Sequence, residues 1–323
     1  MVRPGRADCG ALYRRKMERT RDRTGGSELK RLMNFAISQD DVERYESRED
    51  LRRFYETAGC DGLEVMPLEE DKKGLVGPGM VVGVHACCFG DWMERDEEEL
   101  IRHFRKDLDY ARRMKAEFVV FHVTQVDDEE CVTYRMRHSD AEVVQAACVL
   151  INRLLDGQAY DFWFLMENLW WPGLNYLDAS VTRMLLEGVH YKKKGLMLDT
   201  GHFLHTNRGL RTQKEALMYL HGMLDAHKEL LSYIKGIHLH QSLSGAYVKE
   251  WLSRPHVLEE DPPKRMGQVF EHIFSIDRHL PFTEPEVSGL VDRLKPSYLT
   301  LEYITRSRAE HARYLREGME ALS

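Results

Sequence analysis

The stretch Leu196-Met197-Leu198-Asp199-Thr200-Gly201-His202 joins an apolar run to two side chains that can bind a metal ion. Three consecutive aliphatic residues are typical of a buried parallel strand, because such a strand is covered on both faces. Asp199 then lies at the carboxyl end of the strand, and His202 lies in the turn that follows. The stretch predicts that both side chains reach one ion, although a capping Asp and a hydrogen-bonded His would give the same pattern.

Short apolar runs of this kind alternate with longer, charged segments along most of the chain. We expect eight strands, at residues 33–38, 61–66, 81–85, 117–123, 162–167, 195–199, 234–240 and 298–302. We expect helices over 48–58, 97–115, 247–252 and 286–294. Eight strands separated by helical segments imply parallel pairing through crossovers, and eight is the number that closes a (β/α)8 TIM barrel.

The barrel is expected to be a single domain over residues 32–323. Residues 1–31 are rich in Arg, Lys, Gly and Ser without apolar periodicity, so we expect an N-terminal extension that is either poorly ordered or only packs against the barrel. Residues 241–297 are much longer than a simple crossover and contain a proline-rich turn at Asp261-Pro262-Pro263. Because long insertions between a strand and the next helix often shape a binding site, we expect this one to lie over the active face.

The composition is that of a soluble globular enzyme, with 43% hydrophobic and 31% charged residues among 323. No apolar run approaches the roughly 18–20 residues that cross a membrane. The net charge of -7 provides no overall basic field that would attract nucleic acid. These features predict a cytoplasmic protein with no membrane partner.

The six cysteines show no paired spacing and indicate reduced thiols. Cys87 and Cys88 follow the candidate ligand His85 and could be taken for part of a zinc motif. Adjacent residues on a strand point to opposite faces, so at most one of them could join His85, and we expect ordinary packing.

Six consecutive expected strands end in a carboxylate or an imidazole. These residues are His85, His122, Glu167, Asp199, His238 and Glu302. Barrel enzymes place their chemistry at the carboxyl ends of the strands, where these six side chains would meet. Mixed histidine and carboxylate donors suit zinc, manganese or cobalt, and clustered carboxylates require cations to offset their repulsion. The sequence therefore predicts a divalent metal centre.

The order of these short motifs, one for each strand, resembles the xylose-isomerase-like barrel superfamily, which contains sugar isomerases and epimerases and also endonuclease IV. The resemblance covers about residues 33–304. It is carried by the runs Val84-His85-Ala86, Phe121-His122, Met166-Glu167-Asn168, Leu198-Asp199-Thr200-Gly201-His202, Ile237-His238-Leu239, Asp277-Arg278-His279 and Leu301-Glu302.

Similarity to the isomerases and epimerases implies one divalent ion, zinc or manganese, bound to Glu167, Asp199, His238 and Glu302. Glu167 and Glu302 would then exchange a proton of the substrate, which would be a sugar or a cyclitol. His202 and His85 would contact substrate oxygens. Trp170 and Trp171 would line the pocket, although packing at the mouth of the barrel is the alternative for both.

Similarity to endonuclease IV implies up to three zinc ions and a larger ligand set. The additional ligands would be His85, His122, His202, Asp277 and His279, and the reaction would be hydrolysis of a phosphodiester in DNA. Three departures weigh against this hypothesis: no tyrosine follows His85 as in that family, Asp277-Arg278-His279 is far from His238 in sequence, and bulky aromatics replace a small-residue turn after Glu167.

His240 shares a strand face with His238 and is an alternative ligand, although the His-Leu pattern favours His238. We expect the remaining helical and loop histidines to be solvated; they are His103, His138, His190, His221, His227, His256 and His272. Our first hypothesis is a metal-dependent isomerase or epimerase, and the second is a multi-zinc phosphodiesterase that binds DNA. A third is a catalytically idle relative that binds metal or ligand, and any of the three could form an oligomer.

Overall fold

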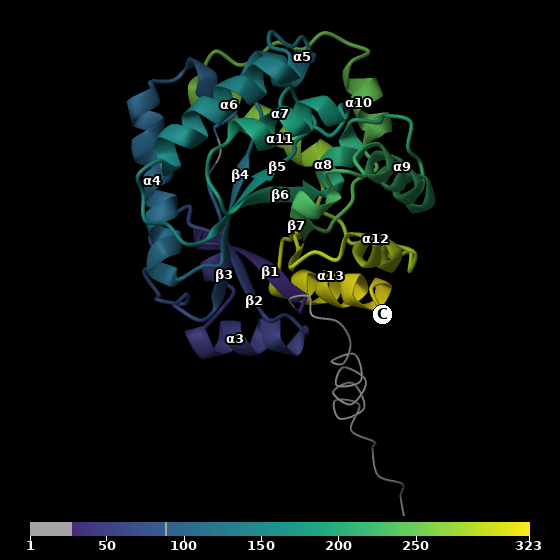
Figure 1. Cartoon of the computed structure of the whole chain (residues 1–323). Coiled ribbons are helices and arrows are strands. Elements are labelled where there is room, and N and C mark those ends of the chain that lie inside the picture. Colours follow the sequence, from purple (N-terminus) through teal and green to yellow (C-terminus); the bar gives the residue numbers. More distant parts are fainter. Residues whose placement is uncertain (1–27, 88) are drawn as a thin grey trace, which may run out of the picture.

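The computed structural model describes residues 28–87 and 89–323 and has eight parallel strands closed into a barrel in sequence order. Figure 1 shows the strands at the centre and the helices around them. The strands are β1 (Lys30–Ala36), β2 (Gly62–Met66), β3 (Val81–His85), β4 (Phe118–His122), β5 (Trp163–Glu167), β6 (Lys194–Asp199), β7 (Ile234–His238) and β8 (Tyr298–Leu301). The predicted (β/α)8 TIM barrel is confirmed.

Apart from α10 (Gly245–Trp251) and α12 (Val287–Leu294), the described α-helices begin at side-chain caps that the sequence supplies. Asp96 accepts a hydrogen bond from the backbone N–H of Glu99, and Thr212 and Glu215 form a reciprocal capping box. The helices are α2 (Gln39–Val42), α3 (Arg48–Thr57), α4 (Glu97–Met114), α5 (Asp128–Thr133), α6 (Asp140–Leu155), α7 (Ala179–Gly188), α8 (Thr200–His205), α9 (Gln213–Ala226), α10 (Gly245–Trp251), α11 (Pro262–Ile276), α12 (Val287–Leu294) and α13 (Arg308–Ala321).

The expected turn at Asp261-Pro262-Pro263 is the start of a helix instead. Asp261 caps α11 by accepting a hydrogen bond from the backbone N–H of Lys264, and the prolines occupy its first two positions. A proline is tolerated there because the first helical N–H groups have no partner within the helix.

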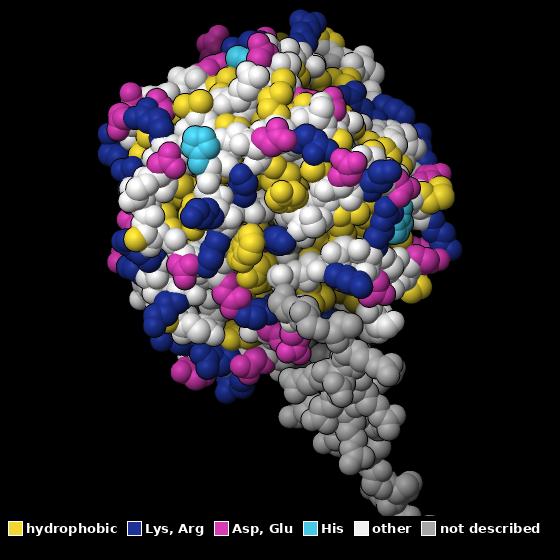
Figure 2. Space-filling view, in the orientation of Figure 1, with side chains coloured by type: hydrophobic (Ala, Val, Ile, Leu, Met, Phe, Trp, Pro, Cys, Tyr) yellow, Lys and Arg dark blue, Asp and Glu magenta, His cyan; other side chains and the backbone are white. Residues whose placement is uncertain are grey.

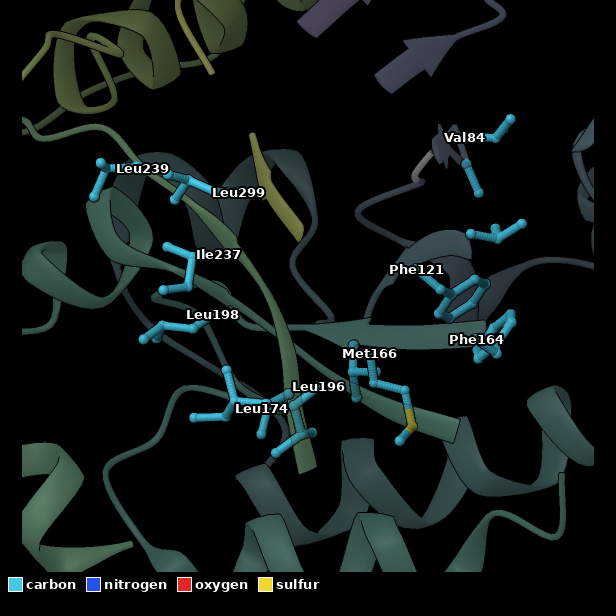
Figure 3. Close-up of a cluster of buried hydrophobic side chains, with 14 of the residues drawn as sticks. Val84, Phe121, Phe164, Met166, Leu174, Leu196, Leu198, Ile237, Leu239 and Leu299 are labelled. Carbon is cyan, nitrogen blue, oxygen red and sulfur yellow. The ribbon is translucent and has the colours of Figure 1, made fainter. Parts of the chain in front are cut away.

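The apolar core lies in two layers. The outer layer fills the space between the strands and the surrounding helices, and Figure 3 shows part of it, including Phe121, Phe164, Met166 and Leu198. The inner layer fills the barrel itself. Its buried members are Leu32, Phe118, Val120, Leu165, Met197 and Tyr298.

The alternation of side chains along each strand places polar groups above this inner layer. Leu165 lies in the inner layer, and Glu167 is two residues further along β5. Met197 and Asp199 have the same relation on β6. Because side chains two residues apart share one face of a strand, the carboxyl end of the barrel receives the ionisable groups that the sequence predicts there.

Residues 241–297 contain α10, α11 and α12. The indole N–H of Trp251 donates to the carbonyl of Val132 over 2.9 Å, and Val269 of α11 packs with Val132 and Trp171. The insertion therefore lies beside α5 and the segment after β5, at the carboxyl end of the barrel (Figure 1).

The chain is already paired in the barrel at Lys30, whose backbone N–H donates to the carbonyl of Ser297. The expected extension at 1–31 otherwise lies outside the described residues. Within the described ranges, no helix combines the length and the apolar character required to cross a membrane.

Candidate metal centre

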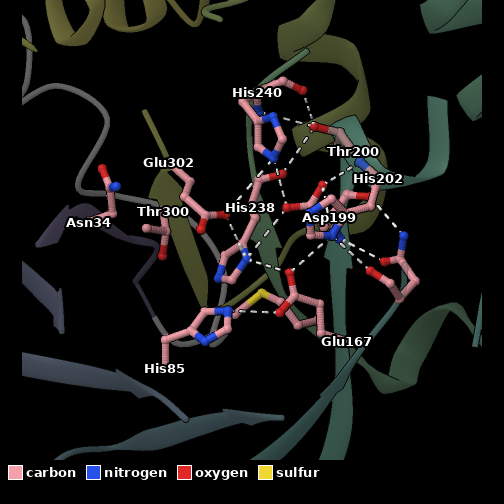
Figure 4. Close-up of polar contacts among 12 residues, drawn as sticks. Asn34, His85, Glu167, Asp199, Thr200, His202, His238, His240, Thr300 and Glu302 are labelled. Atoms are coloured by element: carbon pink, nitrogen blue, oxygen red, sulfur yellow. Dashed lines mark hydrogen bonds and ion pairs between the residues drawn. The ribbon is translucent and has the colours of Figure 1, made fainter. Parts of the chain in front are cut away.

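Four groups of donor atoms lie at the carboxyl end of the described barrel, and in each group the atoms are within 4.8 Å of one another. One of them is Glu64, His85 and His238; the other three, numbered below, contain the ligands that the sequence predicts. Figure 4 shows most of these side chains pointing toward a common region. Group one is Glu167, Asp199, His238 and Glu302; group two is His85, His122 and Glu167; group three is His202, His240, Asp277 and His279. Every residue predicted as a metal ligand is in one of the groups, and Glu167 is in two.

In group one, His238 lies between two carboxylates. Its Nδ1 is 2.8 Å from Glu167 Oε1 and 3.0 Å from Glu302 Oε2. Asp199 Oδ2 is 3.7 Å from the same nitrogen. His238, Glu167 and Asp199 have no exposed surface, and the side chain of Glu302 is 14% exposed. One imidazole nitrogen and three carboxylates therefore face one buried point.

Sequence reasoning missed Glu64, which orients His238 from the opposite side. Glu64 Oε1 is 2.9 Å from His238 Nε2, and Glu64 Oε2 accepts a hydrogen bond of 2.5 Å from the hydroxyl of Thr300. Carboxylates therefore face both ring nitrogens and, despite burial, raise the pKa of His238 well above its usual range. When an ion in group one takes up Nδ1, Glu64 is placed to hold the remaining proton on Nε2. The available signal was a single carboxylate within the apolar residues of β2.

In group two, Glu167 is approached by two imidazoles. Its Oε2 is 3.1 Å from His85 Nε2 and 2.9 Å from His122 Nε2. Nevertheless Glu167 Oε2 and both nitrogens of His122 are buried without a hydrogen bond in the described structure. His85 Nδ1 is 3.1 Å from the carbonyl of Ala86, which places the proton on Nδ1 and the lone pair on Nε2. Such an arrangement suits a shared cation more than direct hydrogen bonding.

In group three, Asp277 is the central carboxylate. Its Oδ2 is 3.1 Å from His202 Nε2 and 2.8 Å from His279 Nε2. Although Asp277-Arg278-His279 is far from His238 in sequence, Asp277 and His279 lie at the barrel mouth, because α10 and α11 form a detour that returns there. Reciprocal backbone hydrogen bonds between Gln241 and Leu280, of 2.8 and 3.0 Å, hold the two ends of the detour together.

The hydrogen bonds of group three fix which nitrogen of each ring can bind a metal. His202 Nδ1 is 2.9 Å from the carbonyl of Asn168, and His279 Nδ1 is 3.1 Å from the carbonyl of Glu302. A carbonyl only accepts, so both rings carry the proton on Nδ1 and direct Nε2 at Asp277. The lone pairs on Nε2 of both rings then face the negatively charged oxygens of Asp277. These groups repel one another unless a metal ion lies between them or each Nε2 carries a second proton. The residues fit a divalent ion.

The pKa values report the same competition between burial and charge. Burial disfavours the cationic form of His202 and of His279, but the carboxylates of Asp199 and Asp277 outweigh it and raise the pKa to about 10 and about 9. Burial opposes ionisation of Glu302, yet neighbouring His238 lowers its pKa to about 2. The pKa of Asp277 is also held well below its usual range, because His279 and His202 outweigh burial. The carboxylates of the centre are therefore ionised.

His240 is an additional member of the centre, not a replacement for His238. Its Nε2 is 2.8 Å from Asp199 Oδ2, and its ring stacks on His279 at a centroid distance of 3.9 Å. His205, which sequence reasoning missed, lies one helical turn beyond His202 on α8. Its Nε2 is 3.2 Å from Asp277 Oδ1, and its side chain is 2% exposed. The spacing of three residues between the two histidines was the signal that could have identified it.

The two tryptophans after β5 have different surroundings. The ring of Trp170 is 5.4 Å from that of His202 and 4.7 Å from that of His205, so it borders group three. Trp171 is buried and packs with Val132 and Val269. Substrate contacts for Trp170, Trp171, His202 and His85 stay predictions.

Two histidines expected to be solvated are buried. His227 is 2% exposed and lies 3.2 Å from the hydroxyl of Thr182, and His272 is 1% exposed and lies 2.9 Å from the hydroxyl of Tyr247. Both nitrogens of His227 have polar neighbours, since its Nδ1 lies 3.0 Å from the carbonyl of Met223, whereas His272 Nε2 is buried without a hydrogen-bond partner among the described residues. Both histidines lie outside the three groups.

Comparison with known proteins gives a family match and fold similarities. The sequence model of the family described as xylose isomerase-like TIM barrel matches residues 45–323. No curated protein matches the sequence. Endonuclease IV from Thermus thermophilus is similar in structure, with a TM-score of 0.53 at 16% identity over 91% of this chain and 98% of that protein.

Two further solved structures cover the same 91% of this chain and 98% of their own chains at 14% identity. A D-tagatose 3-epimerase-like protein has a TM-score of 0.54, and an IOLI protein with a bound zinc atom has a TM-score of 0.56. At these identities the similarity establishes the fold.

Proposed function

Since the chain belongs to the xylose isomerase-like TIM barrel family, we propose that it is a divalent-metal-dependent enzyme that hydrolyses a phosphate ester of a small molecule. One observation carries the proposal: groups one and two share Glu167, and group three lies directly beside group one, with His240 Nε2 2.8 Å from Asp199 Oδ2, so the three groups form a single buried centre. An isomerase requires only group one, whereas clustered ions are the usual solution for phosphoester hydrolysis.

Bound zinc or manganese ions would polarise phosphoryl oxygens and lower the pKa of water. Groups one and two would hold ions on either side of Glu167. Group three would hold another through Nε2 of His202 and His279 and the carboxylate of Asp277.

The side chains of the centre have separate tasks in this proposal. With metal bound, Glu64 would hold the proton of His238 on Nε2, and the carbonyls of Asn168 and Glu302 would hold the protons of His202 and His279 on Nδ1. Glu302, with 14% of its side chain exposed, is the most exposed ligand of group one and would be the one nearest to solvent. Trp170 would exclude water beside group three.

A small substrate is favoured over duplex DNA. The metal-binding side chains are buried, and the segment after β5 and the α10–α11 insertion pack together over them. On the face shown in Figure 2, Lys and Arg are interspersed with Asp and Glu. The net charge of -7 also opposes binding to a polyanion.

The second candidate is the sugar or cyclitol isomerase, because group one is complete on its own. In that reaction Glu167 and Glu302, on either side of His238, would transfer a proton at the substrate carbon. A catalytically idle relative would bind metal without turnover. The cytoplasmic location and an oligomeric state stay predictions.

Metal content and hydrolysis together test the proposal. Elemental mass spectrometry would count the ions in the wild type, Glu167→Ala and His279→Ala, with the 68% exposed His190→Ala as a matched histidine control. We expect His279→Ala to lose one ion, Glu167→Ala to lose at least one, and His190→Ala to lose none. The wild type should hydrolyse p-nitrophenyl phosphate esters.

A centre that holds one ion lost with Glu167→Ala but retained in His279→Ala would support the isomerase instead. Exchange of a sugar proton with solvent deuterium would then be the assay. Cleavage of an abasic-site duplex, without hydrolysis of small esters, would contradict the proposed substrate class.

A further inference from the structure

A separate group of donors lies where α4 packs against the end of β3. Cys87, His103 and Asp107 each offer one donor atom, and these atoms lie within 4.8 Å of one another. His103 and Asp107 are four residues apart on α4, so they share one face of the helix. Cys87 comes from the segment after β3, which brings sulfur, nitrogen and oxygen donors together from two elements.

Two of these side chains are poorly satisfied for their burial. His103 Nε2 is buried and has no hydrogen-bond partner in the described structure. Asp107 is 6% exposed, and its carboxylate accepts a hydrogen bond of 2.9 Å from the backbone N–H of Cys87. A buried carboxylate with one neutral donor is costly, and a nearby cation offsets that cost.

We propose that Cys87, His103 and Asp107 bind a zinc ion that is distinct from the ions at the barrel mouth. Zinc accepts thiolate, imidazole and carboxylate donors in one tetrahedral site, with the remaining position open to solvent. Bonds of about 2.0–2.3 Å hold such donors roughly 3.3–3.8 Å apart, so binding would draw these atoms together by at most about 1.5 Å.

The site would also stabilise the region that presents His85. His85 ends β3, and Cys87 is two residues further along the chain. An ion that joins Cys87 to α4 would therefore fix the segment between β3 and that helix. The ring of Phe89, 4.5 Å from that of His103, would shield the ion on one side.

Cobalt(II) distinguishes the two kinds of site, because the mouth groups contain only nitrogen and oxygen donors. We would load metal-stripped protein with cobalt to saturation and record the near-ultraviolet thiolate-to-cobalt charge-transfer band. The wild type should show the band, Cys87→Ser should lose it, and the neighbouring control Cys88→Ser should retain it. His103→Ala, a change at a half-buried position, should also lose it.

Metal counting supplies a second measurement that does not depend on activity. Cys87→Ser and His103→Ala should each bind one zinc ion fewer than the wild type, while His279→Ala should retain the cobalt–thiolate band. Absence of the band in the wild type, or its loss with Cys88→Ser, would overturn the proposal. Circular dichroism of each variant would establish that the fold is retained.

Discussion

The barrel interior has two halves built from the same strands: a lower half, which is the inner apolar layer, and an upper half, at the carboxyl ends of the strands, which contains the ionisable side chains. In the lower half, Phe118 and Leu165 form a close-packed apolar layer. In the upper half, His122 lies four residues after Phe118 on β4, and Glu167 lies two residues after Leu165 on β5. Both belong to a buried cluster of ionisable groups. Burial of apolar surface stabilises the fold, whereas burial of charge without a counter-ion opposes it. Residues only two to four positions apart on one strand therefore have different roles: the first stabilise the fold, and the later ones can bind metal ions.

The largest effect expected in the lower half is on stability alone. Phe118→Ala should lower the free energy of unfolding by about 3–5 kcal/mol, because the ring is fully buried and lies 4.4 Å from that of Tyr298. The ring also occupies the space that a Cβ of Gly83 would fill. Chemical denaturation would measure the loss, and metal content per folded chain should not change.

Leu68→Ala is the control for this prediction, since the side chain is 51% exposed and should matter little. A loss below about 1 kcal/mol in Phe118→Ala would contradict the assignment of a tightly packed lower layer.

The upper half should instead respond to pH through metal binding. In the absence of metal, the pKa values of His202 and His279 are raised to about 10 and about 9, so both rings are protonated at pH 7. A metal ion requires the neutral ring, and binding must release these protons. With two protons released, the affinity should rise by up to about a hundredfold per pH unit between pH 6 and 8.

Calorimetric titration with zinc in two buffers of different ionisation enthalpy would count the protons released. An affinity that does not change with pH would contradict the placement of these two rings around Asp277. His279→Ala should release fewer protons than the wild type.

Orientation of His238 by Glu64 should have a smaller effect. Glu64→Gln keeps an oxygen that can accept the hydrogen bond but removes the charge that favours a proton on His238 Nε2. Loss of such a partner typically weakens metal affinity by about 10- to 100-fold. Competition with a chromogenic chelator would measure the change, and Glu64→Ala should be weaker still. Equal affinity in both variants and the wild type would assign Glu64 a purely structural role.

The sequence predicts the barrel well because its signals are local. Each apolar run ends in an ionisable residue, and parallel strands necessarily bring such ends together, so Glu167, Asp199 and His238 could be placed without coordinates. The four helices expected from the sequence agree with α3, α4, α10 and α12 to within two residues at each end, whereas the proline pair expected to form a turn begins α11.

The rest of the site depends on contacts that no local pattern encodes. Asp277 reaches the centre only because α10 and α11 return the chain to Gln241, and the length of a connection does not reveal its path. Glu64 is a single carboxylate in a strand, so its role required the position of His238. Strand alternation was applied only to Cys87 and Cys88 beside His85, and it could not show that α4 places His103 and Asp107 next to Cys87.

The smallest effect is expected outside the barrel, at an ion pair that serves stability alone. Arg308 donates to both carboxylate oxygens of Asp50, over 2.7 and 2.8 Å, and this bidentate contact lowers the pKa of Asp50 to about 2. An acid whose pKa is lower in the folded state stabilises the protein above its unfolded pKa of about 4, and the contribution disappears as the pH falls toward 2. Because the arginine side chain is 37% exposed, we expect the ion pair to stabilise the folded state by at most about 1 kcal/mol.

The free energies of unfolding of the wild type and Asp50→Asn should differ by that amount at pH 6 and converge near pH 2. Asp161→Asn, at a 90% exposed position, is the control and should match the wild type throughout. A difference in stability that persists at pH 2 would show that Asp50 acts through packing and not through its charge. A pH-dependent effect of ionisable groups would then be expected only at the barrel mouth, where protons compete with metal ions.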